Sequence, residues 1–227
     1  SECTSLTDFN ILGTVEYFGD QTFYGDTALE EFKLPNSNVS LGSYCFYQCT
    51  NLNKLEFAQE SYVSEILGSI IEETCVSKFI VDANNKYYSV SSDGALLLSK
   101  DGKKIIFAAP SREYKDYVLD EKYEEIAPAA FSGVNIKTLT IVNPNTIIGE
   151  YSFANCDTLE KVIFPTSSGV VVKEHAFNYD KALVELENLN NVLSVADYAF
   201  ANTGLKKITL ANNATYGEGA FFQSKVE

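Results

Sequence analysis

The chain has 227 residues, of which 45% are hydrophobic and 13% aromatic, so it can bury a sizeable core and is not disordered by composition. Its formal net charge of −14 argues against a general binder of nucleic-acid backbones, because such a protein needs a basic face. It contains no apolar run of the ~18 residues that a membrane-spanning helix needs, so no direct membrane insertion is expected.

The two ends of the chain indicate a piece of a longer protein. The start, "SECTSLTDFN", lacks the basic and apolar regions of a signal peptide, and the chain contains no Met. The end, "AFFQSKVE", stops just after a repeat begins. We therefore expect an excised or processed fragment, and the missing signal sequence says little about where the parent protein is located.

The dominant feature of the sequence is a repeat built around one Phe, here called the anchor. Outside one gap the anchors are separated by 23, 22, 24, 23 and 21 residues, within the 20 to 29 residues typical of leucine-rich repeats. A small residue precedes nearly every anchor, and an apolar residue stands five positions before it. The anchors are Phe23, Phe46, Phe131, Phe153, Phe177, Phe200 and Phe221. We expect these rings to be buried and to stack between coils, because a single repeat is too small to bury its own apolar face.

An apolar triplet, spaced apolar-x-x-apolar-x-apolar, follows every anchor except Phe221. Its last two members alternate with a polar residue, which is the period of a short strand with one buried face. Asn188 breaks the third position of one copy. The predicted strands centre on Phe9, Phe32, Leu55, Phe79, Leu139, Val162, Leu186 and Ile208. No sustained helical stripe occurs, so little long helix is expected.

The gap in the repeat contains a different element, residues 84–110. Asp93-Gly94 and Asp101-Gly102 stand between short apolar runs there, which is a strong local signal for hairpin turns. We predict a β-hairpin insertion within one continuous repeat array, because an interrupted solenoid is simpler than two domains.

The phrase "IGEYSFANCDTLEKVIFP" resembles the BspA-like leucine-rich repeat, whose consensus is close to I-G-x-x-A-F-x-x-C-x-x-L-x-x-I-x-I-P. The resemblance covers nearly the whole chain. It implies a leucine-rich-repeat solenoid, and the 84–110 insertion is similar to a "DG-x-L" hairpin found in some arrays of the family. It also implies a bacterial or protist surface protein, since several members have been assigned adhesion to host matrix or to other cells. The family pattern contains no catalytic residues.

The predicted fold is a single leucine-rich-repeat solenoid over residues 1–227, of the alpha-beta horseshoe class. It is expected to be β-rich, with one parallel sheet, about eight coils and the hairpin insertion. Right-handed coiling is expected from the usual chirality of parallel crossover connections.

The cysteines are predicted to be free and structural. Cys49 and Cys156 share one register five coils apart, roughly 25 Å at strand spacing, and Cys3 and Cys49 are about 10 Å apart. Both separations exceed the ~7 Å limit between the Cα atoms of a disulfide. Cys45 lies four residues before Cys49, but it is expected to point inward while Cys49 sits at the following turn. Cys75 has no counterpart in the other coils.

No catalytic, metal or cofactor site is predicted. His175 is the only histidine and occupies the repeat position held elsewhere by Tyr44, Tyr151 and Tyr198, so it is interpreted as a ladder or surface substitution. No nucleophile motif accompanies it, no Cys/His group has zinc-site spacing, and no calcium or phosphate-binding loop occurs. The sequons that begin at Asn38 and Asn213 matter only in a glycosylating secretory pathway.

The candidate binding surface is the exposed face of the predicted sheet, expected to be concave. These positions are mixed in charge and carry no aromatic residue, so a simple solvated face is the alternative. The candidates are Glu31, Lys33, Lys54, Glu56, Lys78, Thr138, Thr140, Lys161, Glu185, Glu187, Lys207 and Thr209. The tyrosines around the insertion form a competing candidate patch: Tyr87, Tyr88, Tyr114, Tyr117 and Tyr123.

Two function classes remain. The first is a non-enzymatic extracellular or cell-surface module that binds an unidentified protein or matrix ligand, with adhesion as the role that the resemblance implies. The second is a structural spacer that presents another domain of a larger surface protein. The sequence alone names no ligand.

Overall fold

The structure is a computed structural model that describes residues 7, 11, 13–66, 70–167 and 169–225. The expected strand around Phe9 and the cysteine Cys3 lie outside these residues. The fold is a β-solenoid of about eight turns with almost no helix, as the repeat predicted. In the described residues the one helical element is a single 3-10 turn, η1 (Leu189–Asn191).

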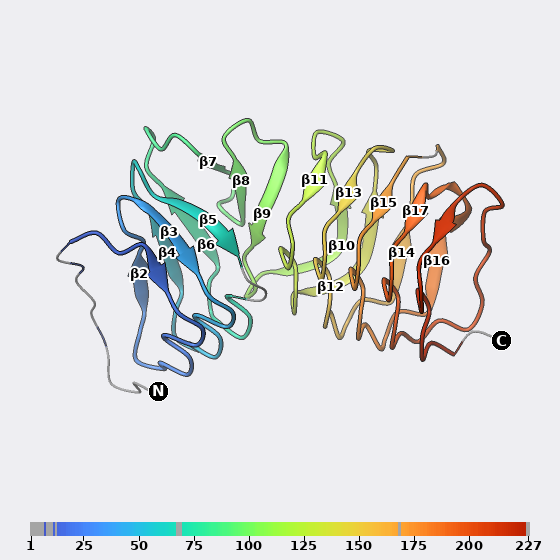
Figure 1. Cartoon of the computed structure of the whole chain (residues 1–227), viewed down its shortest axis with the longest axis horizontal. Coiled ribbons are helices and arrows are strands. Elements are labelled where there is room, and N and C mark those ends of the chain that lie inside the picture. Colours follow the sequence, from blue (N-terminus) through green and yellow to red (C-terminus); the bar gives the residue numbers. More distant parts are fainter. Residues whose placement is uncertain (1–6, 8–10, 12, 67–69, 168, 226–227) are drawn as a thin grey trace. The chain divides into compact units, whose positions relative to one another are not determined.

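The chain divides into two compact units. The first comprises residues 1–102 and 106–112, and the second comprises residues 103–105 and 113–227. Both are built from short strands linked by tight turns (Figure 1). The expectation of one solenoid domain over residues 1–227 stays a prediction.

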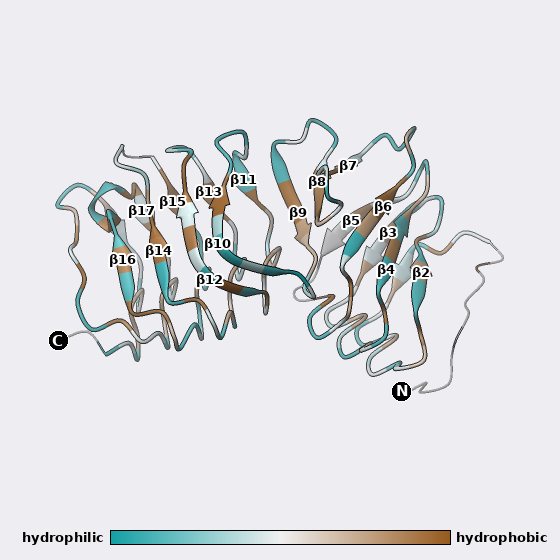
Figure 2. Cartoon of the chain, turned by 180° about the vertical axis from the view of Figure 1, so that it is seen from behind, coloured by the Kyte–Doolittle hydropathy of each residue, from teal (hydrophilic) through white to brown (hydrophobic). Residues whose placement is uncertain are grey.

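The first unit contains two parallel three-stranded sheets. Their orders are β1-β3-β5 and β2-β4-β6. The strands are β1 (Tyr17–Phe18), β2 (Glu31–Lys33), β3 (Asn38–Leu41), β4 (Lys54–Phe57), β5 (Tyr62–Ile66) and β6 (Lys78–Val81). Strands of both sheets mix hydrophilic and hydrophobic residues (Figure 2), as expected for strands with one face on the core.

The second unit also has two rows of parallel strands. One is the sheet β10-β12-β14-β16, and the other runs β18-β17-β15-β13-β11 and continues to Lys104 and Ile105 of β9. The strands are β10 (Glu113–Leu119), β11 (Glu125–Ile126), β12 (Asn135–Ile141), β13 (Ile147–Ile148), β14 (Lys161–Ile163), β15 (Val171–Val172), β16 (Glu185–Glu187), β17 (Ser194–Val195) and β18 (Thr215–Tyr216). Residues 104–105 of β9 (Lys104–Ala108) belong to this unit, and residues 106–108 belong to the first.

The prediction of one parallel sheet is therefore wrong in this detail, because each unit has two rows of strands. The additional strands include the apolar residue five positions before the anchor. These residues are Phe18, Leu41, Ile126, Ile148, Val172, Val195 and Tyr216. Most of these strands are two residues long, too short to show an alternating pattern in the sequence, which is why the pattern did not reveal them.

Most of the predicted triplet strands are confirmed, since β2, β4, β6, β12, β14 and β16 contain the expected central residues. The strand predicted at Ile208 is wrong, because residues 203–211 form no strand. Asn188, directly after β16, adopts a left-handed conformation with φ of 58° and is followed by η1. The backbone N–H of Ala211 also donates to the hydroxyl of Tyr216 at 2.9 Å, which holds this segment to its own coil.

The Phe anchors form the predicted internal stacks. Phe46, Phe131, Phe153, Phe177 and Phe200 are at most 1% exposed, which confirms their expected burial. Successive rings of the second unit are nearly parallel, and the ring centroids of Phe177 and Phe200 are 5.0 Å apart. The N–H of Phe177 donates to the carbonyl of Ala199 at 2.8 Å. Hydrogen-bonded backbones thus set the coil spacing at which the rings stack.

Each coil turns tightly on both sides of its anchor. The residue two positions before the anchor and the residue two positions after it have positive φ, as at Tyr151 (53°) and Asn155 (59°) around Phe153. Glycine is required where coils approach closely: a Cβ on Gly149 would lie 2.4 Å from the carbonyl oxygen of Ile126. Every coil therefore has the same sharp corner at its anchor.

The insertion contains the expected turns. β7 (Tyr88–Val90) and β8 (Leu96–Ser99) pair antiparallel, and Gly94 has φ of +75° and donates to the carbonyl of Ser91 at 2.8 Å. Gly102 has φ of +74° and donates to Ser99 at 2.9 Å in the same way, joining β8 to its neighbour β9. The Asp-Gly hairpin prediction is confirmed, and a third strand follows the hairpin.

Candidate functional site

The outward side chains of β2, β4 and β6 form two short rows on the first unit. Glu31, Lys54 and Lys78 are in register, and so are Lys33 and Glu56. Lys54 contacts carboxylates on both sides, with its Nζ 3.1 Å from Glu31 and in close contact with Glu56. These hydrogen bonds raise the pKa of Lys54, that to Glu56 contributing most. The row is therefore largely neutralised within itself.

The second unit repeats this arrangement on β12, β14 and β16. Thr138, Lys161 and Glu185 form one row, and Thr140, Ile163 and Glu187 form the next. The Nζ of Lys161 lies 3.1 Å from Glu185 and in close contact with Glu187. The hydrogen bond from Lys161 holds the pKa of Glu187 below its usual range. One lysine thus pairs with two glutamates at the edge of this sheet, which leaves one net negative charge.

Ten of the twelve candidate residues lie on these strands, in two separate groups. Glu31, Lys33, Lys54, Glu56 and Lys78 belong to the first unit, and Thr138, Thr140, Lys161, Glu185 and Glu187 to the second. Lys207 and Thr209 are exposed but lie outside any strand, because the strand expected at Ile208 does not form. Their assignment to the sheet face is corrected accordingly.

The tyrosines around the insertion serve mainly in packing. Tyr88 and Tyr123 are buried, and the hydroxyl of Tyr88 accepts a hydrogen bond from the N–H of Val63 at 3.0 Å. The rings of Tyr114 and Tyr117 pack against that of Phe131. These four residues do not form a shared exposed patch.

A stacked aromatic ladder runs along the turns of the second unit. The ring of His175 lies between those of Tyr151 and Tyr198, at centroid distances of 4.6 and 5.3 Å. Its Nε2 is 3.3 Å from a carboxylate oxygen of Glu174 and its Nδ1 is 3.2 Å from the amide of Asn178. His175 therefore occupies the tyrosine position of the repeat, as expected, and its contacts are those of a ladder residue.

The described cysteines are thiols that take part in no disulfide, as predicted. Cys45, Cys49 and Cys156 are buried, and Cys75 is exposed. The thiol of Cys49 donates to the carbonyl of Phe23 at 2.8 Å, and that of Cys156 donates to Phe131 at 3.2 Å. Their shared repeat position is therefore a buried thiol-to-carbonyl contact between coils.

Thiol reactivity tests this placement. Burial raises the pKa of Cys45 to about 12 and that of Cys49 to about 11, which lowers the thiolate population at least about a hundred-fold below that of an ordinary thiol. In a Cys3→Ser variant, we expect a thiol reagent to label Cys75 first and the three buried thiols only on unfolding. Titration of the unaltered chain in denaturant without reductant should count all five thiols; three or fewer would show a disulfide.

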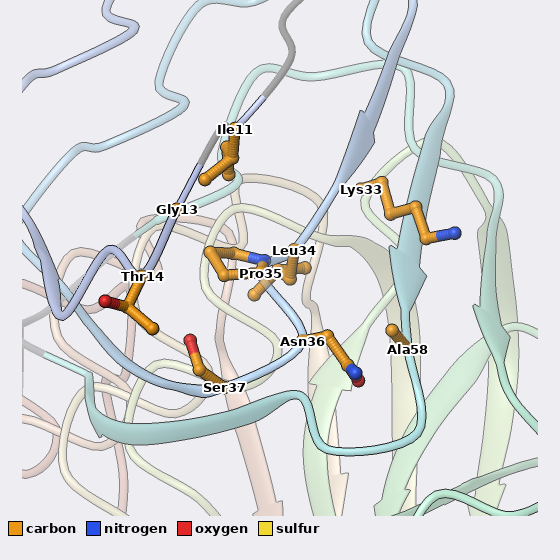
Figure 3. Close-up of a pocket in the computed structure, with 9 residues that line it drawn as sticks. All are labelled: Ile11, Gly13, Thr14, Lys33, Leu34, Pro35, Asn36, Ser37 and Ala58. Carbon is orange, nitrogen blue, oxygen red and sulfur yellow. The ribbon is translucent and has the colours of Figure 1, made fainter.

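Each unit carries a surface hollow. The first, of about 310 Å³, is lined by Ile11, Gly13, Thr14, Lys33, Leu34, Pro35, Asn36, Ser37 and Ala58. Figure 3 shows Ile11, Gly13 and Thr14 along one segment, with Pro35 facing them. The second, of about 550 Å³, lies beside β10, β12 and β14 and has both acidic and basic residues, including Asp116, Lys137 and Glu160.

Among the residues that the structure describes, no group of three or more His, Cys, Asp or Glu side chains is placed to hold a metal ion. Within the same residues, no helix has the length and apolar character needed to span a bilayer.

The model of the BspA type leucine-rich repeat region matches residues 1–92 and 104–227, with six copies. The chain belongs to the BspA-type leucine-rich-repeat family. The residues between the two matched ranges, 93–103, lie inside the hairpin insertion. No curated protein sequence matches the chain.

Two solved structures show this BspA-type chain's fold in other proteins. A leucine-rich repeat protein from Eubacterium ventriosum is 17% identical with a TM-score of 0.53, over 98% of this chain and 72% of that one. The pneumococcal vaccine antigen PcpA is 21% identical with a TM-score of 0.57, over 94% of this chain and 53% of that one. This chain therefore spans about half of the PcpA chain, and at these identities the likeness shows the fold alone.

Sequence reasoning named the charged residues of this BspA-type chain's candidate face but missed the ion pairs between them. The ion pairs that fix Lys54 and Lys161 depend on which residues of adjacent coils are in register. A signal was present, because a lysine stands at the first outward position of two triplets and a glutamate occupies that position one coil away. Pairing the outward positions of successive triplets would have found both.

Proposed function

We propose that the chain is a non-enzymatic protein-binding module of an extracellular or cell-surface protein, and that it acts in adhesion to host or matrix proteins. Its membership of the BspA-type family supports this role, because the family resemblance implies surface proteins and no catalytic residues. A pneumococcal vaccine antigen is among the proteins with this fold.

The observation that carries the proposal is the contrast between inward and outward residues of the same strands. Inward positions are apolar from coil to coil, as at Leu139 and Val162, because they build the core. Outward positions change chemistry at every coil, from Thr138 to Lys161 to Glu185. In solenoids the face that is free of packing constraints is the one available for recognition.

Binding to immobilised fibronectin, laminin and collagen tests the proposal. A Thr138→Glu, Thr140→Glu variant places two charges at the centre of the face of the second unit, and we expect it to weaken binding at least about ten-fold. Thr166→Glu, at an exposed turn off the strands, is the matched control and should bind as the unaltered chain does. Equal binding by both variants would contradict the role of this face.

A structural spacer is the second candidate, favoured by the ion pairs on the two faces. Lys54 and Lys161 are each held by two carboxylates of the same unit, so part of the charge is already satisfied without a ligand. A spacer would bind none of the immobilised proteins, and the two threonine variants would then behave alike.

A further inference from the structure

In the described residues, the last coil of the second unit is hydrogen-bonded to the coil before it at the turns and in one row of strands, but not in the other row. At the turns, the N–H of Phe200 donates to the carbonyl of Ala220, and the N–H of Asn202 donates to that of Phe222, both at 2.8 Å. In the second row of strands, β17 pairs with β18. In the other row, within the part of the chain that the structure describes, β16 pairs with β14 alone.

The open side of β16 presents backbone groups of Leu186. The carbonyl of Glu187 accepts from the N–H of Phe164 at 3.0 Å, so the backbone groups of Glu187 point towards β14. Because successive residues of a strand point their backbone groups in opposite directions, the N–H and C=O of Leu186 point to the open side. An edge strand of this kind is a template for pairing with another strand.

The side chains at this edge define what the added strand must carry. Leu186 and Ile208 are only partly buried, and Leu210 is 48% exposed, so the surface beside β16 includes apolar side chains. Glu185 and Glu187 flank Leu186 and share a single positive charge, that of Lys161. The two glutamates and the one lysine therefore leave one net negative charge beside the apolar centre.

We propose that the outer edge of β16 binds an extended peptide by strand addition, and that this peptide has one apolar residue flanked by Lys or Arg. The apolar residue packs on Leu186, and the flanking cations face Glu185 and Glu187. This inference deepens the proposed function, on which it rests, by giving a chemistry for a polypeptide partner.

The same charges disfavour a second copy of the chain at this edge. An antiparallel pair of β16 strands centred on Leu186 would place each Glu185 opposite a Glu187, and like charges directly opposite each other destabilise a strand pair. The chain's own Lys207 and Ile208 have the required pattern, but their segment is held to Tyr216 through Ala211. The segment around Ile208 is therefore the part of the chain that would compete with the peptide for the edge of β16.

Amide exchange measured by NMR, with a synthetic peptide as the probe, tests the proposal. The probe is acetyl-Ser-Lys-Ile-Lys-Ser-amide, with acetyl-Ser-Glu-Ile-Glu-Ser-amide and an N-methylated Lys peptide as controls. We expect the N–H of Leu186 to exchange rapidly in the free protein and to be slowed only by the Lys peptide. Glu185→Gln and Glu187→Gln should each weaken binding about two- to five-fold, and Glu150→Gln, at an exposed turn of another coil, should not.

Each other outcome overturns the proposal. If the Leu186 N–H is already protected from exchange without peptide, another strand occupies the edge. That strand belongs to a second copy of the chain if the protection rises with protein concentration. It is the chain's own segment around Ile208 if the protection does not depend on concentration. Equal binding of the Lys and Glu peptides removes the charge argument. Because the probe is synthetic, failure of the peptide to bind β16 leaves the result of the matrix-protein experiment unaffected. Failure of the chain to bind matrix proteins likewise leaves the peptide result unaffected.

Discussion

Replacing Phe177 by Ala is expected to lower the free energy of unfolding by about 3 to 5 kcal/mol, as large truncations in a packed core do. The ring of Phe177 is fully buried, and its centroid lies 5.3 Å from that of Phe153 and 5.0 Å from that of Phe200. Truncation would leave a cavity between two rings whose coils are hydrogen-bonded at fixed spacing. These rings therefore cannot close the gap without breaking backbone bonds.

Urea unfolding followed by circular dichroism and tyrosine fluorescence measures this loss. Because the chain has two compact units, the comparison uses the transition that the variant shifts, and the two probes must agree on it. Phe222→Ala is the matched control, since its ring is 51% exposed, and we expect a change within about 0.5 kcal/mol. A loss below about 1 kcal/mol for Phe177→Ala would contradict the stacked-ring account of stability.

The buried anchors were predictable from sequence because one residue type recurs at a period set by the coil. A ring at Phe131, Phe153 and Phe177 can repeat at intervals of 22 and 24 residues only if each occupies the same place in its coil. The Asp93-Gly94 turn was predictable for a different reason, because few residues tolerate the positive φ that such a turn requires.

The strand at Ile208 was mispredicted because a local pattern does not ensure pairing with the neighbouring coil. The pattern Leu205, Ile208, Leu210 fits the repeat. A strand also needs hydrogen bonds to a partner, and this segment does not pair with β16; the N–H of Ala211 instead donates to the hydroxyl of Tyr216. A tertiary condition of this kind overrides the local pattern.

The candidate site was predictable in position and unpredictable in charge balance. Alternation along a strand shows that Lys161 faces outward, but not which residues lie beside it. Its contact with Glu185 and Glu187 follows from the register between β14 and β16, which depends on the path of the intervening coil. The mixed charges read from the sequence therefore became ion-paired rows in the structure.

Replacing Asp180 by Asn is expected to stabilise the chain at neutral pH by about 1 to 3 kcal/mol, because it removes the cost of burying a negative charge. Asp180 occupies the repeat position of Cys156 and is fully buried. One carboxylate oxygen accepts from the N–H of Cys156 at 2.8 Å, and in the described structure the other, Oδ2, has no partner. An Asn keeps the accepting oxygen and carries no charge.

The pH dependence of this gain identifies its cause. Burial, reinforced by the charge of Asp157, raises the pKa of Asp180 well above its usual value of 3.8, although the N–H of Cys156 opposes the shift. The folded state thus favours the protonated form of Asp180. The stability that this protonated form contributes is complete below the pKa that Asp180 has in the unfolded chain, and it is lost as the pH rises through the pKa that Asp180 has in the folded chain. The advantage of Asp180→Asn over the unaltered chain should therefore be small at acid pH and grow towards neutrality. Asp116→Asn, an exposed change of the same charge on β10, should show no such growth. A constant advantage across the pH range would mean that the buried acid is not what costs stability here.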